Sequence, residues 1–121
     1  MKKMLIFPFI LLLMLSFSNS ASANDLTGHY HEKSLRYLIL KGALTADERG
    51  NYYPNQMVTR AEFAHYLAVT LELPEATEPT EFVDVPQNSP YYASIQKAAA
   101  AKIITGYGDQ TFKPNSTISR V

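Results

Sequence analysis

The chain repeats itself at a spacing of sixty residues. Aligned with itself at that shift, the sequence needs no gap. The matched pairs include Ser34 with Ser94, Leu35 with Ile95, Leu44 with Ile104, Thr45 with Thr105, Pro54 with Pro114, Asn55 with Asn115, Thr59 with Ser119 and Arg60 with Arg120. This internal repeat predicts two similar structural units in tandem.

The clearest predicted helix lies within residues 57–73. Thr59 is a good N-cap, and Glu62 stands three residues later, as in a capping box. Pro74 ends the run. One buried stripe is expected from apolar residues at three- and four-residue spacing, namely Ala64, Leu67, Ala68 and Leu71.

Arg60 breaks the local rules of this helix. It sits in the first turn, where the helix dipole is positive and a cation is disfavoured by roughly 0.3–1 kcal/mol. One interpretation is a solvated arginine beside Glu62. The other is that free backbone N–H groups and the guanidinium fork together attract an external anion. The second occurrence at Arg120 favours an anion site.

Each unit is expected to have the same order of elements. An aspartate-containing segment leads to a helix, then a turn-rich loop, a brief extended piece and the capped helix. The leading helices are expected at residues 31–41 and 91–101, with Gly42 after the first and Ser89-Pro90 as the N-cap and first helical position of the second. The boundaries predicted are residues 24–74 for repeat 1, 75–81 for a polar linker and 82–121 for repeat 2. Repeat 2 lacks its second helix, which indicates a fragment or a truncated reading frame.

The first 23 residues have the pattern of a signal peptide. Lys2 and Lys3 precede an apolar run, and Ala21-Ser22-Ala23 forms an A-x-A cleavage site. The run is too short for a membrane span of about 20 residues. Export to the outside of a bacterium, with cleavage after Ala23, is therefore expected.

The remaining composition excludes some partners. Without the leader, nine basic residues stand against eleven acidic ones, and there is no basic tract for nucleic acid. There is no cysteine, so disulfides cannot contribute to stability. Three histidines without ligand spacing predict no metal site, and nothing indicates a cofactor.

Several of these motifs resemble those of the S-layer homology (SLH) domain. The resemblance covers Asn24 to Val121 and rests on four stretches: Asp25-Leu26-Thr27-Gly28-His29-Tyr30, Ile103-Ile104-Thr105-Gly106-Tyr107, Phe112-Lys113-Pro114 and Thr59-Arg60-Ala61-Glu62. The last is the family's four-residue signature, which begins again at Ser119-Arg120-Val121. Tyr30 stands where tryptophan is usual, and Ala46-Asp47 stands where Gly-Tyr is usual.

The resemblance implies a mainly α fold of tandem helix–loop–helix repeats within a pseudo-threefold helical assembly. It also implies non-covalent binding of secondary cell-wall polysaccharide, often carrying a pyruvate ketal, or of a peptidoglycan-linked glycan, in grooves between neighbouring units. Further SLH units in the same or another chain would be partners. The residues it implies for polysaccharide binding are Arg60, Arg120, Tyr30, Tyr91, Asp25 and Asp84, with Thr59, Glu62 and Ser119 as the helix-capping positions of the signature.

Three alternatives remain at the level of sequence. Asp25 and Asp84 are residue types that commonly cap turns, so they need not touch a sugar. A wall-active enzyme needs a paired acid and base or an activated nucleophile, and Glu62 already has a capping role. We therefore expect no catalysis from this stretch, although it could target an enzyme. A structural unit that binds no glycan is the third possibility.

Overall fold

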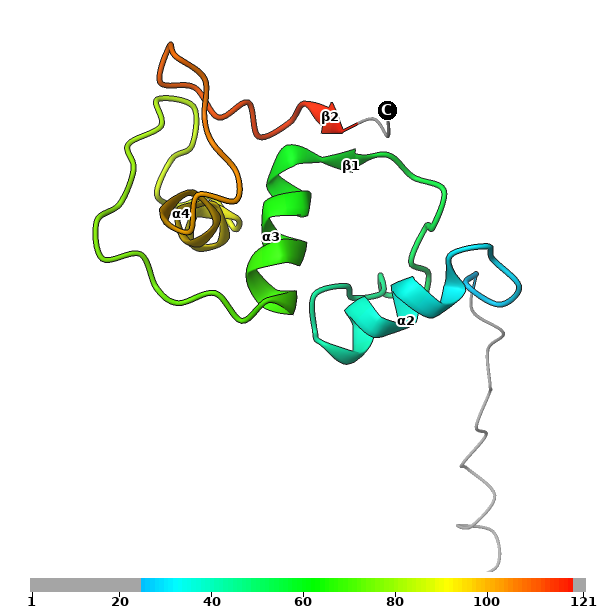
Figure 1. Cartoon of the computed structure of the whole chain (residues 1–121). Helices are drawn as coiled ribbons and strands as arrows, with labels where there is room; N and C mark the ends of the chain where they lie inside the picture. The colour runs from blue at the N-terminus through cyan, green and yellow to red at the C-terminus, as the bar shows by residue number, and fades with distance from the viewer. Residues whose placement is uncertain (1–24, 119–121) are drawn as a thin grey trace, which may run out of the picture.

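The structure is a computed structural model that describes residues 25–118 and is mainly helical, as predicted (Figure 1). The signal peptide expected at residues 1–23 and the second signature, Ser119 and Arg120, lie outside the described residues. The elements in chain order are α2 (Glu32–Leu40), β1 (Val58–Thr59), α3 (Arg60–Thr70), α4 (Tyr92–Ala100) and β2 (Thr117–Ile118). In the described part of the chain, no helix is long and apolar enough to cross a bilayer.

The start of α3 is the predicted capping box. The Thr59 hydroxyl accepts a hydrogen bond from Glu62 N at 3.2 Å, and the Glu62 carboxylate accepts one from Thr59 N at 2.8 Å. Two N–H groups that a helix start would leave unpaired are thereby satisfied. The buried stripe holds for Ala64 and Ala68, but the prediction is wrong for Leu71, which is the C-cap and is 54% exposed.

The signature helix α3 packs against the leading helix of the other repeat, α4 (Figure 1). Alanines at the contact have no side chain beyond Cβ, so the two backbones can approach closely. The main core therefore lies between the repeats and consists of Ala61, Ala64, Val85, Ile95, Ala98 and Phe112.

A short antiparallel ladder also joins the repeats. In it Val58 pairs with Ile118, and Thr59 pairs with Thr117. Just beyond it, Arg60 N donates to Ser116 O at 2.8 Å, and Ala61 N donates to Pro114 O at 3.0 Å. The expectation of free N–H groups at this helix start is therefore wrong for these two residues, because the second repeat supplies their acceptors.

The leading helix of the second repeat begins later than expected. The helix α4 starts at Tyr92 with Tyr91 as its N-cap, so Ser89-Pro90 are not the N-cap and first position. Tyr92 N donates to Ser89 O at 3.1 Å, and Tyr91 N donates to Ser89 Oγ at 3.3 Å. These bonds form a turn that delays the helix by two residues. After α2, by contrast, Gly42 adopts a φ of +75°, as its predicted place beyond the helix end requires.

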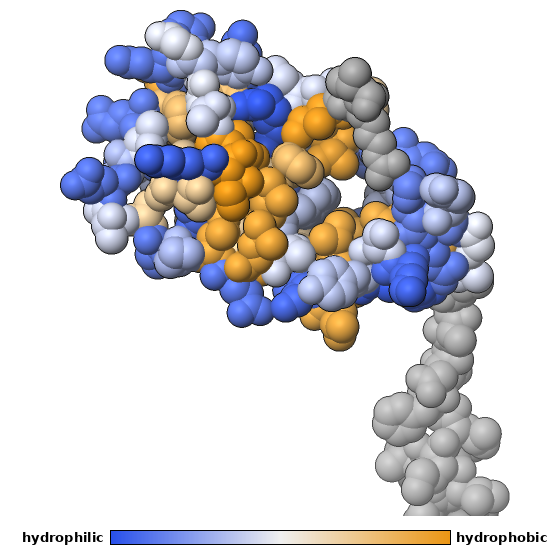
Figure 2. All heavy atoms as spheres, in the orientation of Figure 1, coloured by the Kyte–Doolittle hydropathy of each residue, from blue (hydrophilic) through white to orange (hydrophobic). Residues whose placement is uncertain are grey.

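The leading helix of the first repeat has an open side. None of the nine residues of α2 is buried, whereas Ile95 and Ala98 of α4 are fully buried under α3. The residues matching them, Leu35 and Leu38, line a hollow of about 640 Å³ that also reaches Phe63 and Tyr66 of α3. Figure 2 shows apolar surface on both sides of this opening.

Candidate functional site

The candidate site is built around Arg60 at the start of α3. Its Nε donates to Phe112 O at 2.8 Å, and one terminal nitrogen donates to Thr105 O at 3.0 Å. The guanidinium carbon also lies 4.7 Å from the centroid of the Phe112 ring. Both acceptors belong to the second repeat, so the two repeats together hold the side chain in place.

The charge of Arg60 has no acidic partner among residues 25–118. The ion pairs found there join Arg36 to Glu32, Lys41 to Glu72 and Lys97 to Glu75. Glu62, the acid nearest in sequence, is committed to the capping box. A guanidinium has five N–H donors. The two bonds above leave donors for an additional acceptor.

A pocket of about 330 Å³ lies beside this guanidinium. Its walls come from both repeats and combine the arginine with apolar side chains and the hydroxyl-bearing Thr105. The lining residues are Arg60, Phe63, Ile103, Ile104, Thr105 and Ile118. Such a wall offers a cation for a carboxylate and apolar surface for the C–H face of a sugar.

Two residues that were not predicted from the sequence as site residues adjoin Arg60 through one aromatic ring, outside the lining of the pocket. The Tyr107 ring centroid lies 5.1 Å from the Arg60 guanidinium carbon and 4.2 Å from Lys113 Nζ. Tyr107 is 45% exposed, so its ring is accessible to a ligand. The Gly106-Tyr107 and Phe112-Lys113-Pro114 stretches were visible as motifs, but their convergence on Arg60 depends on contacts some fifty residues apart.

The nominated tyrosines lie in other surroundings. Tyr91 packs against the core between the repeats, with its ring 6.0 Å from that of His65. Burial, and then the charge of Glu62, raises its pKa. Tyr30 is 93% exposed and stands at the larger hollow beside α2, whose lining does not include Arg60. The structure therefore does not bring Tyr30 to the Arg60 pocket.

The nominated aspartates both bind backbone. Asp84 accepts hydrogen bonds from Phe112 N and Lys113 N at 2.8 and 2.7 Å. Asp25 accepts equivalent bonds from Tyr52 N and Tyr53 N, at 3.0 and 2.7 Å. In the described structure both carboxylates cap turns, which is the alternative use of an aspartate. Asp84 acts on the site by fixing the segment that contacts Arg60.

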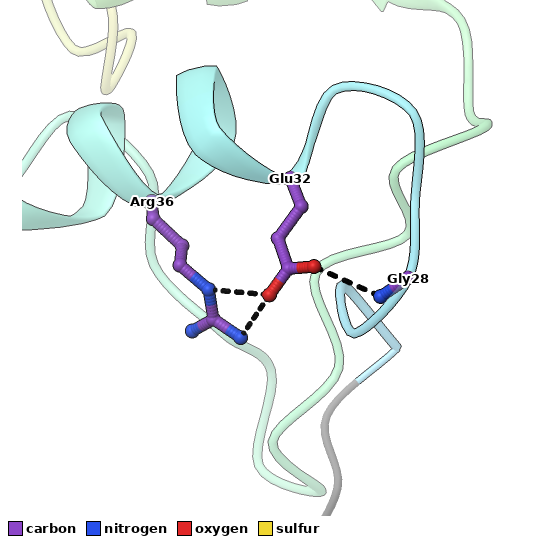
Figure 3. A network of polar contacts seen from close by, with 3 residues as sticks. All are labelled: Gly28, Glu32 and Arg36. Atoms are coloured by element: carbon purple, nitrogen blue, oxygen red, sulfur yellow. Dashed lines mark hydrogen bonds and ion pairs between the residues drawn. The ribbon is translucent and has the colours of Figure 1, made fainter.

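The segment that carries Tyr30 is held by Glu32, the first residue of α2 (Figure 3). The Glu32 carboxylate accepts from Gly28 N at 2.9 Å and from Arg36 Nε at 2.8 Å. The Gly28 bond first, and then the Arg36 bond, lower the pKa of Glu32. In residues 25–118 no group of three acidic or histidine side chains is arranged to hold a metal ion.

These features define a class of protein: tandem repeats in which the arginine-bearing helix of one unit completes the core and the candidate pocket of the next. The chain belongs to the S-layer homology domain family, whose sequence profile matches residues 24–64 and 81–120. Repeat and family were both expected from the sequence, and the family is confirmed.

Curated relatives include surface proteins and enzymes. S-layer protein EA1 of Bacillus anthracis is 36% identical over 97 residues, which cover 77% of this chain and 11% of that protein. An S-layer protein of Bacillus thuringiensis subsp. finitimus is 35% identical over 96 residues, again with 77% and 11% covered. An amylopullulanase of Thermoanaerobacterium thermosulfurigenes is 30% identical over 105 residues, or 87% of this chain and 6% of the enzyme.

Proposed function

We propose that this chain anchors a protein to the bacterial cell surface by binding an acidic polysaccharide of the cell wall, with no catalysis of its own. The acidic group would be a carboxylate, such as a pyruvate ketal on secondary cell-wall polysaccharide. Signal cleavage would place the chain outside the membrane. Membership of the SLH family and the similarity to S-layer proteins support the anchoring role.

The observation that carries the proposal is the position of Arg60. Its guanidinium is oriented by two backbone carbonyls and lies beside a pocket, yet it has no carboxylate partner in the described chain. A fork held this way can receive a carboxylate with little further loss of rotamer freedom. A charge-assisted hydrogen bond of this kind contributes about 1.5–3 kcal/mol.

The other residues predicted from the sequence have different roles in this proposal. Arg120 would serve a neighbouring unit as Arg60 serves the second repeat. Tyr91 and Tyr30 would offer aromatic surface to sugar rings, each in a separate part of the molecule. Asp25 and Asp84 would position the loops, since their oxygens already accept backbone hydrogen bonds.

The similarity to enzymes supports targeting. The matched segment occupies 6% of the amylopullulanase and 9% of an exoglucanase of Acetivibrio thermocellus. The same kind of segment is thus a small part of S-layer proteins and of these enzymes. We propose that SLH units of this kind attach whatever protein carries them, whether an S-layer subunit or an enzyme.

The test is binding of the purified chain to polysaccharide released from a Bacillus cell wall. Arg60→Ala should weaken binding at least tenfold, and removal of pyruvate from the glycan by mild acid should do the same. Arg49→Ala is the matched control, because it removes an exposed arginine of the first repeat and should leave binding unchanged. Circular dichroism melts separate lost binding from lost folding, and Arg60→Lys should retain part of the affinity.

Two results would oppose the proposal. Equal binding by the folded wild type and Arg60→Ala proteins would remove the anion site. Failure of the wild type to bind any wall glycan would favour a structural unit that mediates assembly alone.

A further inference from the structure

We propose that Tyr107 and Lys113, which do not line the Arg60 pocket but adjoin Arg60 through the Tyr107 ring, form with it a site with two cations, which selects a glycan segment bearing two acidic groups. This inference rests on the proposed function and names the ligand class of the same site. The second acidic group is a carboxylate or a phosphate, since an ammonium group binds either as a point charge.

One aromatic ring sets the distance between the two cations. Lys113 Nζ lies 4.2 Å and the Arg60 guanidinium carbon 5.1 Å from the centroid of Tyr107. The charges are thus no further apart than the sum of these distances, close to the Debye length of about 8 Å at physiological salt. A ligand whose two acidic groups are spaced within this limit can contact both cations at once.

The nearby carboxylates are engaged with other donors. Asp84 accepts from the backbone N–H groups of Phe112 and Lys113. Asp109 accepts from Thr111 N at 3.1 Å and from Thr111 Oγ1 at 2.6 Å. Neither forms an ion pair with the Lys113 ammonium within residues 25–118, although the charge of Lys113, after the Thr111 hydrogen bonds, contributes to the lowered pKa of Asp109.

The backbone that carries Lys113 is held in place. Its φ is +57°, and Asp84 accepts its N–H at 2.7 Å while its own carbonyl accepts from Ser116 N at 3.1 Å. A non-glycine residue rarely adopts this left-handed conformation, and the hydrogen bonds on either side hold Lys113 in it. The turn therefore projects the lysine beside Tyr107 at a fixed point in the fold.

The loop of the first repeat is a useful comparison. It has the same backbone hydrogen bonds as the loop of the second repeat, but it carries an acidic side chain where the second repeat carries an aromatic one. Asp47 N donates to Asn51 O, just as Tyr107 N donates to Thr111 O. Asp47 thus occupies the place of Tyr107, and Tyr53, with a φ of +52°, occupies the place of Lys113. Tyr53 Oη donates to Asp47 Oδ2 at 2.5 Å. That loop presents an acid and a phenol, so the pair of cations belongs to the second repeat.

The experiment compares two synthetic probes by isothermal titration. One is the methyl glycoside of a hexose that carries a pyruvate ketal, which has a single acid. The other carries a phosphate at position 3 as well. Lys113→Asn removes the charge with a side chain that tolerates positive φ. It should weaken the two-acid probe about tenfold and the one-acid probe less than about twofold.

The controls separate this inference from the proposed function. Lys33→Asn removes an exposed lysine of α2 and should change neither Kd, whereas Lys113→Arg should preserve the preference for the two-acid probe. If Arg60→Ala weakens both probes while Lys113→Asn weakens neither, or weakens both equally, the two-cation inference is overturned and the anion site stands. If the wild type binds the wall polysaccharide but prefers neither probe, the two-cation inference alone is overturned, whereas failure to bind the polysaccharide overturns the proposed function.

Discussion

Arg60 Nε and the carbonyl oxygen of Phe112 are 2.8 Å apart, although the residues stand 52 positions apart in the chain. The Phe112 ring is fully buried in the core between the repeats. The arginine that we propose as the anion contact is thus also part of the joint between the two units. Binding and folding measurements on variants of this site must therefore be made together.

Removing the charge of Asp84 should loosen the turn that meets Arg60. In Asp84→Asn, the single amide oxygen can accept from Phe112 N or Lys113 N but is poorly placed for both. A backbone N–H left without its partner costs about 1–3 kcal/mol. The urea midpoint of unfolding should fall accordingly. Glu81→Gln, at an exposed position just before this segment, is the control and should leave the midpoint unchanged.

The glycine between Thr105 and Tyr107 should not tolerate a side chain. A Cβ at Gly106 would overlap the Phe82 ring and lie 2.9 Å from Thr111 O. Gly106→Ala should therefore destabilise the chain by about 1–3 kcal/mol, as other overpacked sites do. Gly108→Ala is a matched control in the same loop, because a Cβ there meets nothing within 4 Å. Equal thermal midpoints for the two variants would contradict the tight packing of this loop.

The Glu32 carboxyl should titrate below its ordinary pKa, and Gly28 should matter more than Arg36 (Figure 3). A lowered folded-state pKa gives stability that is present above the pKa of the unfolded chain and is lost as the pH falls through the folded value. In Arg36→Ala the pKa should rise but stay below ordinary, since the Gly28 N–H bond remains. Carboxyl carbon shifts measured by NMR from pH 2 to pH 7 give both values. A return to the ordinary pKa in Arg36→Ala would show that the Gly28 bond contributes little.

Short-range features of the fold were predictable from the sequence. The capping box at Thr59 and Glu62 depends on residues three positions apart, and Gly42 needs only its place after a helix. The match at sixty residues was a strong signal because many weak identities share one spacing. These features can be predicted from one unit alone, because the residues that form them are close together in the sequence or recur in the repeat.

Contacts between the repeats were not predictable in the same way. The sequence does not say that Ser116 O would accept the N–H of Arg60, or that Tyr107 and Lys113 would stand beside its guanidinium. Leu71 fits the apolar period of α3, but the helix ends there and 54% of the residue stays exposed. These outcomes depend on how one unit lies on the next, and local periodicity does not contain that information.

The repeat also identifies a position where the second unit is strained. Gly42 and Lys102 follow their leading helices at matching positions, and both have positive φ, +75° and +57°. A lysine in the left-handed region is destabilised by roughly 1–2 kcal/mol. A glycine avoids this strain but lowers stability by about 0.5–1 kcal/mol, because it raises the entropy of the unfolded chain. Lys102→Gly should therefore stabilise the protein by about 0.5–1 kcal/mol, seen as a higher urea midpoint with an unchanged slope. Lys102→Ala keeps the strain and should not show this gain, and a midpoint for Lys102→Gly at or below that of the wild type would contradict the prediction.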